Sequence, residues 1–356
     1  MGLKELNEGN VRMADRAVVN GGVQRRQDLG LLDVSRGLPA VGAGRVLSQT
    51  GWGSPSELGQ AAVGAKGTSV PQLWLCGGTG ALPPVYQRLV VEGVEPQLIR
   101  RHGCTVGVRY EDAHAEYCLL TGVLPPDLKT SREAQALAVF EGIEDALTDA
   151  GMTFAHVART WLYLDRLLEW YGAFNQVRDT FFKSRRVYDG LVPASTGIGS
   201  ANLCGSAITA CAIAVKPKRP GSVTVEAVPS PLQCPALEYG SSFSRAVEIA
   251  TPEYRTLMVS GTASIEPGGA TAFVDDVPGQ IQLTMDVVEA ILVSRGMGWH
   301  DATRAVMYLK KASYAQAWQA WLKAHRLEAM PLVTIEADVC RDDLLVELEI
   351  DTVKKV

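Results

Sequence analysis

The sequence predicts an α+β fold in which two similar units follow one another, each a two-layer arrangement with helices on one face of a sheet. The first observation is an internal repeat, because a constant shift of 145 residues aligns Gly151 with Gly296 and Arg159 with Arg304. The second is a long amphipathic helical pattern in both copies. The third is a strand pattern directly after each helix, ARTWLYL and then TRAVMYL.

The elements of the two copies come in the same order. Each copy opens with a strand that ends in glycine, YCLLTG and TLMVSG. The long helix follows, and its apolar residues step by three and four positions, which places them on one face. These residues are Phe140, Ile143 and Leu147 in the first copy and Met285, Val288 and Leu292 in the second. A strand, a second helix and two further strands complete each unit.

Local signals predict where the long helices begin and end. Thr130 to Glu133 reads as a capping box before the first helix. Gly151 and Gly296 are expected to end the two helices. The predicted domains are residues 1–110, a poorly interpretable region that is part of the first domain; 111–216, the first unit; 217–223, a linker; and 224–356, the second unit. Gly77, Gly78 and Gly80 predict a tight turn rather than a phosphate-binding loop, because the spacing of such loops is absent.

Composition excludes several classes of protein. The formal net charge of -5 provides no basic field for nucleic acid. The seven cysteines and five histidines are scattered, so they predict reduced thiols and no metal site. No apolar run is long enough to span a membrane, and no signal peptide is evident. We therefore expect a cytoplasmic protein without metal or cofactor.

The stretch ADVCRDDLLVELEI near the end of the chain carries an unusual row of acids. Alternation from Asp343 places Glu347, Glu349 and Asp351 on one face, together with Leu345. The opposite face carries Leu344, Val346, Leu348 and Ile350. The second copy has Leu345-Val346-Glu347 where the first has Ile208-Thr209-Ala210, so only one copy carries an acid there. One interpretation of Glu347 is a solvated glutamate on a surface strand, with an ordinary pKa; the alternative is a working acid.

Several segments together resemble a known family. The unit with its R-T-x-x-Y-L strand and L-V-E-x-E strand is similar to the RidA/YjgF superfamily, whose units have a chorismate-mutase-like α/β fold. SGTASI, EYGSSFSRAVE, PASTGIG and DVCRDDLLVELE together resemble the chorismatases within it, over about residues 110–356. The resemblance implies units packed sheet to sheet with ligands in clefts between them. It also implies an enzyme that releases pyruvate from chorismate or a close cyclohexadiene carboxylate, giving a hydroxybenzoate or a dihydroxycyclohexadiene carboxylate. The segment EPGGATAFVDDVPG departs from the family in lacking histidine.

The resemblance also assigns catalytic roles. Glu347 is expected to be the general acid, with a pKa raised by a partly dry cleft. Cys340 lies seven residues earlier, as in chorismatases that form 3-hydroxybenzoate, and is expected to help open a ring intermediate. The alternative for Cys340 is a small buried hydrophobic residue.

The substrate-binding residues are expected to hold two carboxylates. Arg159 and Arg245 are the candidate clamps, because a guanidinium pairs with a carboxylate in a bidentate way. Tyr163 and Tyr239 are candidate hydroxyl donors. The backbone amides of Thr196 and Gly197 are candidates for the second carboxylate. The alternative for each arginine is a surface ion pair. The alternative for each tyrosine is packing in the core.

Two other functions stay open at this point. A RidA-type imine or enamine deaminase would carry an arginine just after the proline of its fifth strand. Here the copies read Pro193-Ala194-Ser195 and Pro331-Leu332-Val333, so that arginine is missing in both. A non-catalytic member that binds a small carboxylate is the third possibility. The expected partner is a small-molecule carboxylate, without nucleic acid or membrane, for a monomer or a homotrimer.

Overall fold

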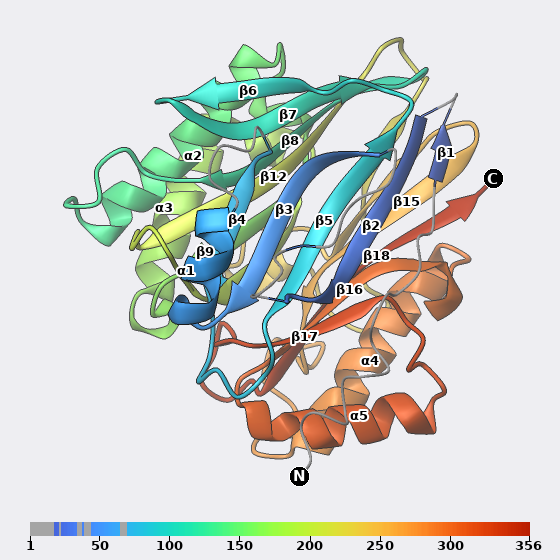
Figure 1. The fold of residues 1–356 in the computed structure, drawn as a ribbon. Coiled ribbons are helices and arrows are strands. Elements are labelled where there is room, and N and C mark those ends of the chain that lie inside the picture. The colour runs from blue at the N-terminus through green and yellow to red at the C-terminus, as the bar shows by residue number, and fades with distance from the viewer. Residues whose placement is uncertain (1–17, 21–22, 34–37, 39–43, 65–69) are drawn as a thin grey trace.

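The fold is taken from a computed structural model of the chain that describes residues 18–20, 23–33, 38, 44–64 and 70–356. Three six-stranded sheets are found in these ranges. The five α-helices of the described residues lie outside the sheets, as Figure 1 shows. The predicted α+β class, with helices on one face of each sheet, is confirmed.

The first copy of the repeat forms a sheet with the strand order β10-β9-β12-β8-β7-β6. Its strands are β6 (Gln97–Arg101), β7 (Cys104–Glu111), β8 (Ala115–Val123), β9 (Val157–Leu164), β10 (Ala194–Gly199) and β12 (Ile208–Pro217). Helix α2 (Arg132–Asp149) connects β8 to β9, and α3 (Tyr171–Ser184) connects β9 to β10. Because α3 forms a crossover connection, β9 and β10 run parallel, whereas the other neighbours are antiparallel.

The second copy repeats this arrangement in the order β13-β14-β15-β18-β16-β17. Its strands are β13 (Thr224–Val228), β14 (Ala246–Ala250), β15 (Tyr254–Thr262), β16 (Ala302–Leu309), β17 (Leu332–Glu336) and β18 (Val346–Lys355). Helices α4 (Val277–Ser294) and α5 (Ala315–Ala324) take the places of α2 and α3. The predicted order of elements is therefore confirmed in both copies.

The region that the sequence left uninterpreted forms a third sheet, with the order β1-β2-β5-β3-β4-β11. Its strands are β1 (Val18–Asn20), β2 (Val23–Leu31), β3 (Arg45–Gly53), β4 (Gln72–Cys76), β5 (Val85–Glu92) and β11 (Ala201–Asn202), with helix α1 (Pro55–Gly64) between β3 and β4. The pairing of β2, β5, β3 and β4 matches that of β15, β18, β16 and β17. The stretch of sequence between β2 and β3 is shorter than the 18 residues of α2 or α4. The sheet is thus a shortened third unit.

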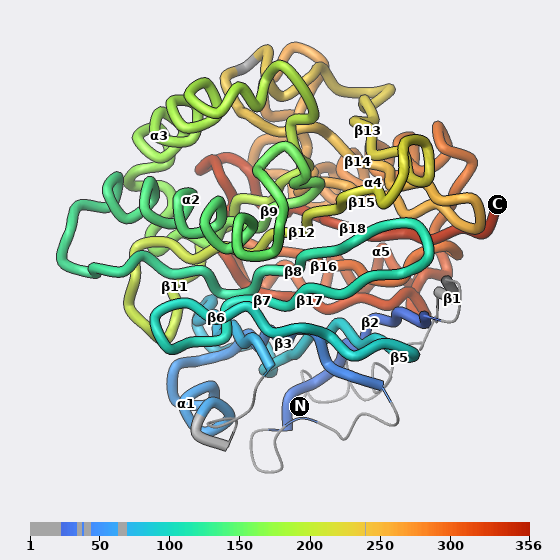
Figure 2. Tube along the Cα trace, turned by 90° about the horizontal axis from the view of Figure 1, so that it is seen from above, coloured from blue at the N-terminus to red at the C-terminus, as the bar shows by residue number. Residues whose placement is uncertain are grey.

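The three sheets pack on one another through a shared apolar core. Buried side chains from all three sheets form one cluster: Leu29, Trp52, Leu73, Leu75, Val85, Trp161, Tyr163, Ile198, Cys211, Val306, Tyr308, Val333, Ile335 and Ala337. Figure 2 shows the strands gathered in the middle of the molecule, with α1, α2 and α3 on the outside. The side chains of this cluster are therefore hidden from solvent, and a polar side chain among them needs a partner within the protein.

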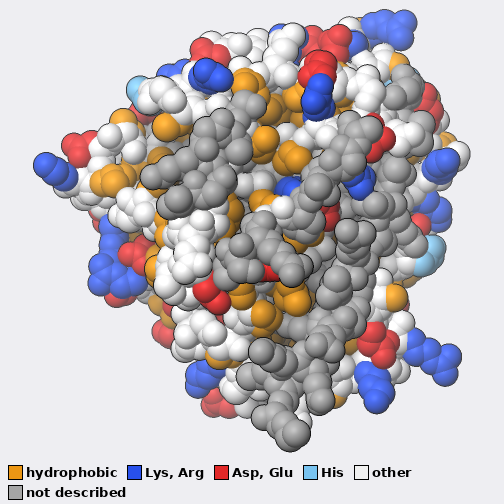
Figure 3. Space-filling view, in the orientation of Figure 1, with side chains coloured by type: hydrophobic (Ala, Val, Ile, Leu, Met, Phe, Trp, Pro, Cys, Tyr) orange, Lys and Arg blue, Asp and Glu red, His pale blue; other side chains and the backbone are white. Residues whose placement is uncertain are grey.

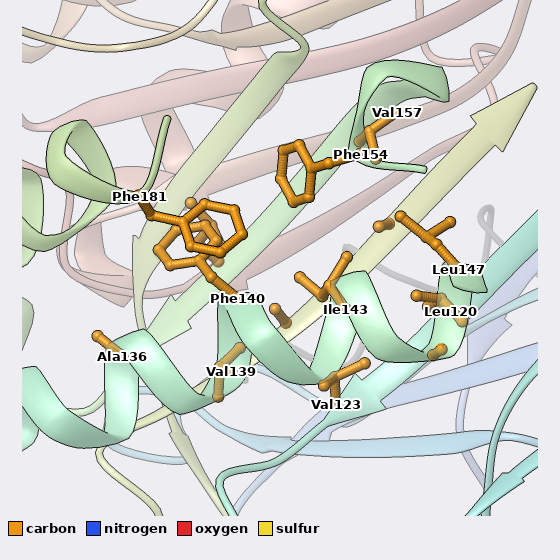
Figure 4. Close-up of a cluster of buried hydrophobic side chains, with 14 of the residues drawn as sticks. Leu120, Val123, Ala136, Val139, Phe140, Ile143, Leu147, Phe154, Val157 and Phe181 are labelled. Carbon is orange, nitrogen blue, oxygen red and sulfur yellow. The ribbon is translucent and has the colours of Figure 1, made fainter. Parts of the chain in front are cut away.

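The outer faces of the two long-helix units are filled by helix side chains. In the first unit Phe140 and Ile143 belong to α2, which lies over β12 and β8, and Phe181 of α3 is stacked on Phe140 at a ring-centroid distance of 5.3 Å (Figure 4). The predicted helix face is confirmed. Gly151 and Gly296 follow the helix ends with φ of 71° and 66°, the left-handed conformation that glycine adopts without strain.

Three local predictions need correction. The cap of α2 is Ser131, whose hydroxyl accepts from the Ala134 amide, one residue later than predicted. The final strand begins at Val346, so the alternation does not reach Leu344 and Leu345. Leu345 packs with the core of the second unit, whereas Leu344 joins a separate small cluster, because both lie in the loop before the strand.

The remaining expectations fare as follows. The domain boundaries stay a prediction. Strand β12 ends at Pro217, and β13 begins at Thr224. Strands β6 and β7 begin before residue 111 but belong to the sheet of the first unit. No helix of the described ranges is long and apolar enough to cross a membrane. Charged side chains of both signs are scattered over the face in Figure 3, without a basic patch among the atoms shown in colour. All seven cysteines are free thiols.

Candidate active site

A pocket lies between the first and second units, where β10 of one meets β15 of the other. It has an empty volume of about 540 Å³, the part open to solvent included. Its lining residues are Tyr171, Arg178, Ser195, Gly197, Ser241, Phe243, Arg245, Gly261, Ala263, Ile265, Cys340, Arg341 and Glu347. Four of the eight predicted site residues are among them: Glu347, Cys340, Gly197 and Arg245.

Two hydrogen bonds fix the wall where the two units meet. The Ser195 amide of β10 donates to the Ser260 hydroxyl at 2.9 Å. The Gly261 amide of β15 donates to the Thr196 hydroxyl at 3.0 Å. The strand of small residues in the first unit therefore lies against the second unit.

Glu347 points into this pocket from β18. Its side chain is 5 % exposed, and no described residue forms a hydrogen bond with its carboxyl group. Burial and the nearby charge of Glu349 raise its pKa to about 8, although Arg159 and Arg245 act in the opposite direction. The carboxyl group is therefore mostly protonated at neutral pH, which is the state that a proton donor needs.

The close contact with Gly261 explains why that position lacks a side chain. A Cβ at Gly261 would overlap the Glu347 Oε1 atom and lie 3.2 Å from the Thr196 Cγ2 atom. The glycine thus allows the carboxyl group to lie directly against the backbone of β15. The junction between the two units therefore sets both the position of the Glu347 carboxyl group and its protonation state.

The register of the sheets corrects the predicted alignment of the two copies. Glu347 lies opposite Tyr308, whereas in the first unit Thr209 lies opposite Tyr163. The counterpart of Glu347 is therefore Thr209, not Ala210. The same register places Cys211 and Ile213 where the second unit has Glu349 and Asp351, so the whole row of acids belongs to one copy.

Cys340 lies in the loop before β18 and also lines the pocket. Burial, with a further contribution from the charge of Glu347, raises the pKa of its thiol to about 12. The sulfur is therefore a neutral thiol at physiological pH, which is a weak nucleophile. The thiol can donate a proton to a ligand or can fill space in the pocket wall, so a catalytic role and a packing role for Cys340 both stay predictions.

The cations of the pocket come from three separate elements. Arg245 donates from Nε and Nη2 to the Cys234 carbonyl at 3.0 and 2.8 Å, just before β14. Arg341 donates from Nη1 to the Gly269 carbonyl at 2.7 Å. Arg178 extends from α3, and neither Arg178 nor Arg341 was predicted from the sequence.

Arg178 is a buried cation without a countercharge. It is 2 % exposed, its Nη2 donates to the Asn175 side chain at 2.8 Å, and its Nε has no hydrogen-bond partner. No described carboxylate forms an ion pair with it. A desolvated guanidinium in a pocket wall favours an anionic ligand. The sequence signal is an arginine four residues after Phe174, on the buried face of α3.

Arg159 and Thr196 lie behind the pocket rather than in its lining. Arg159 Nη2 donates to Glu349 at 2.7 Å and to the Thr196 hydroxyl at 2.6 Å. The Nε and Nη1 atoms of Arg159 are buried and have no hydrogen-bond partner. The role of Arg159 as a substrate clamp stays a prediction.

The backbone of β10 distinguishes the two predicted amide donors. The Ser195 and Gly199 amides donate to the second unit, to Ser260 and to the Asp338 carbonyl. Alternate amides of a strand point to the same edge, so the Gly197 amide also faces the second unit. The Thr196 amide points the other way, towards β9. Gly197 is therefore the better placed donor.

The two predicted tyrosines lie in different parts of the fold. Tyr163 is buried between the sheets, 3 % exposed, and burial raises its pKa well above the usual value. It packs in the shared core and does not line the pocket. The backbone of Tyr239 belongs to a 3-10 helix, Ala236–Tyr239, but its side chain lies outside the described residues.

The fold and this site define a protein of tandem α+β units with a buried acid at the junction between them. Comparisons identify relatives. A 3-hydroxybenzoate synthase from Streptomyces hygroscopicus is 27 % identical over 278 residues, 70 % of this chain and 77 % of that one. A chorismatase from the same organism is 26 % identical over 216 residues, 54 % of this chain and 60 % of that one. A chorismatase crystal structure has a TM-score of 0.68 at 19 % identity, covering 94 % of this chain and 99 % of that one.

No family model matches the chain. The two sequence relatives and the solved structure nevertheless agree with one another. The chain is similar to the chorismatases in sequence and in fold. The resemblance inferred from the sequence is confirmed.

Proposed function

We propose that the protein releases pyruvate from chorismate, with Glu347 as the general acid. The observation that carries the proposal is the Glu347 carboxyl group, which is buried and protonated at neutral pH beside a pocket wall containing three arginines. The relatives named 3-hydroxybenzoate synthase and chorismatase support it. An imine deaminase is less well supported, because Ser195 and Gly197 line the pocket in the strand where that class carries its arginine.

Substrate binding follows from the charges. Chorismate carries one carboxylate on its ring and another on its enolpyruvyl arm. Arg245 and Arg178 are proposed to bind these two carboxylates, with the Gly197 amide donating to one of them. The two guanidiniums extend from different units, so they can hold a dianion across the junction and fix its arm beside Glu347.

The chemical step is a proton transfer to carbon. Glu347 donates its proton to the methylene carbon of the enolpyruvyl group, which leaves a cation on the adjacent carbon. On one route water attacks that carbon, and the bond between it and the bridging oxygen then breaks, which releases pyruvate and leaves a hydroxyl group on the ring. On the other route the neighbouring ring hydroxyl attacks the ring carbon that carries the arm, and the bond from that ring carbon to the bridging oxygen breaks, so pyruvate leaves. The Glu347 carboxylate can then accept a proton released by the attacking group.

Cys340 is proposed to act on the route in which the ring hydroxyl attacks. That route leaves an epoxide-like ring, and opening it requires a proton on oxygen. The neutral thiol of Cys340 lines the same pocket and can supply it. This route gives 3-hydroxybenzoate, and a Cys340→Ala variant should shift the products towards the dihydroxycyclohexadiene carboxylate. Chromatography of the products distinguishes the two.

Pyruvate release coupled to lactate dehydrogenase tests the proposal directly. Wild-type protein should release pyruvate from chorismate above the spontaneous rate, and Glu347→Gln should lose about 10²- to 10⁴-fold in kcat, the usual contribution of a general acid. Asp343→Asn is the control, because it removes a nearby acid that does not line the pocket. A full-rate Glu347→Gln variant would exclude this acid, and no pyruvate from wild-type protein would exclude the substrate.

Assembly and location follow as part of the proposal. One chain provides all the described residues that line the pocket, so a monomer is sufficient for the reaction, and light scattering would separate it from a homotrimer. Seven unpaired thiols support a cytoplasmic location.

A further inference from the structure

A second carboxylate, Glu349, lies behind the pocket and is completely buried. Five side chains donate hydrogen bonds to it. These are Arg159 at 2.7 Å, Thr196 at 2.5 Å, Trp161 at 2.9 Å, Tyr308 at 3.1 Å and Arg304. This number of donors around one carboxylate stabilises its charged form, so the pKa of Glu349 is lowered despite its burial.

The donors of Glu349 come from both copies of the repeat. Arg159 and Arg304 occupy equivalent positions on β9 and β16, yet they bind the same carboxylate. The equivalent of Glu349 in the first unit is Cys211, which carries no charge to match. One carboxylate therefore binds two buried arginines, and the first unit has no carboxylate at the equivalent position.

Glu349 is connected to Glu347 in two ways. The two residues are separated by one position on β18, so their side chains lie on the same face. The Thr196 hydroxyl donates to Glu349 and accepts from the Gly261 amide. Gly261 in turn lies directly against the Glu347 carboxyl group. Glu349 thus contributes to the charge around Glu347 and, through Thr196, fixes the position of Gly261 in the pocket wall.

We propose that Glu349 is a positioning residue, whose fixed negative charge keeps Glu347 in the acid form and whose bond to Thr196 holds Gly261 against it. This inference rests on the proposed function, because it gives Glu349 a role in the same reaction. Glu349 itself does not touch the substrate, since it lies behind the pocket lining.

The direction of the effect follows from the charges around Glu347. Besides Glu349 on β18, these are Arg159 on β9, Arg245 before β14, Arg178 on α3, and Arg341 and Cys340 in the loop before β18. Of them, Glu349 raises the pKa of Glu347, whereas Arg159 and Arg245 lower it. Removing the charge of Glu349 takes away the raising influence and leaves Arg159 less neutralised. Both changes favour an ionised, inactive Glu347.

The test is the pH dependence of pyruvate release by Glu349→Gln. Its apparent pKa should fall by at least one unit relative to wild type, so the rate at pH 7.5 falls several-fold or more and recovers as the solution is made more acidic. A purely structural role would reduce the rate by the same factor at every pH and leave the apparent pKa unchanged, which would overturn the proposal.

Two variants sharpen the comparison. Glu349→Asp retains the charge and should retain most of the wild-type apparent pKa, even if the rate falls. Asp351→Asn removes the acid that also pairs with Arg304, at 3.4 Å, but lies one further position along the same face. It should shift the apparent pKa by less than Glu349→Gln. An equal or larger shift would contradict a specific role for Glu349.

A titration that needs no activity separates this inference from the proposed function. In wild-type protein with ¹³C-labelled glutamate carboxyls, assigned by comparison with Glu347→Gln and Glu349→Gln, Glu347 should titrate well above free glutamate while Glu349 stays ionised throughout. A Glu349 that titrates at neutral pH would overturn the inference, even if pyruvate is released. The expected titration without any pyruvate release would leave the inference standing and exclude the proposed substrate.

Discussion

The raised pKa of Glu347 makes this residue a proton donor and also lowers the stability of the folded protein. Its pKa in the folded protein, about 8, lies above the value of about 4.3 in an unfolded chain. Between these two values the folded state binds a proton that the unfolded state has lost, so stability falls as pH rises through this window. The burial that prepares the acid for catalysis therefore destabilises the protein most above pH 8.

Glu347→Gln should separate these two effects. Glutamine cannot ionise, so the variant should lose activity but be more stable than wild type at pH 8.5, by up to a few kcal/mol. At pH 5 the two proteins should differ much less. Urea unfolding at both pH values measures the difference, and an equal difference at both would show that Glu347 has an ordinary pKa.

Gly261→Ala tests the close contact between β15 and the acid. The added Cβ would overlap the Glu347 carboxyl group, so we expect the side chain to be displaced, with a loss of kcat and about 1–3 kcal/mol of stability. Gly172→Ala is the matched control, because nothing lies within 4 Å of its added Cβ in α3. Activity and urea midpoints measure both variants; a fully active Gly261→Ala would show that the acid has room to move.

At the scale of elements, the repeat predicted more than any single motif did. Spacing of three and four identified α2 and α4, and alternation identified β9 and β16, because these periods follow directly from backbone geometry. The same patterns could not fix the register of β12 against β9. A shift of one residue exchanges the two faces of a strand, so the counterpart of Glu347 was placed on Ala210 instead of Thr209.

Helix α3 contributes more to the pocket than its sequence pattern indicated. Arg178→Met should weaken substrate binding by about 10- to 100-fold in kcat/KM, the contribution of one charge-assisted hydrogen bond. It should not lower the melting temperature, because it removes a buried cation without a countercharge.

Arg185→Met at the end of the same helix provides the control. Arg185 forms a surface ion pair with Glu144 at 2.7 Å, and its loss should change kcat/KM by less than about twofold. Steady-state kinetics and thermal unfolding distinguish the two variants. A lower melting temperature with unchanged kinetics for Arg178→Met would assign Arg178 to the core alone.

At the scale of the whole molecule, the N-terminal sheet completes the packing of the two units. Leu75 of β4 is completely buried in the cluster shared by all three sheets. Leu75→Ala should therefore cost about 2–5 kcal/mol and lower the stability of the entire chain, not of the first sheet alone.

The measurement is equilibrium unfolding followed by both circular dichroism and tryptophan fluorescence. The two transitions should coincide and shift together. Leu98→Ala on β6, which is 39 % exposed, should shift them little. Separate transitions would show that the N-terminal sheet unfolds independently.

The sequence by itself determined the duplicated unit and the order of its strands and helices, because these depend on short-range periodicity and on a direct comparison of the copies. It led to Glu347 as the proposed acid only through a family resemblance. Tertiary structure alone decided that the shortened N-terminal region is a third sheet, that Arg178 lines the pocket, and that Arg159 and Arg304 share Glu349. Those relations join residues far apart in the chain. Which charges face one another inside a protein is set by how its sheets pack, and no local pattern records that.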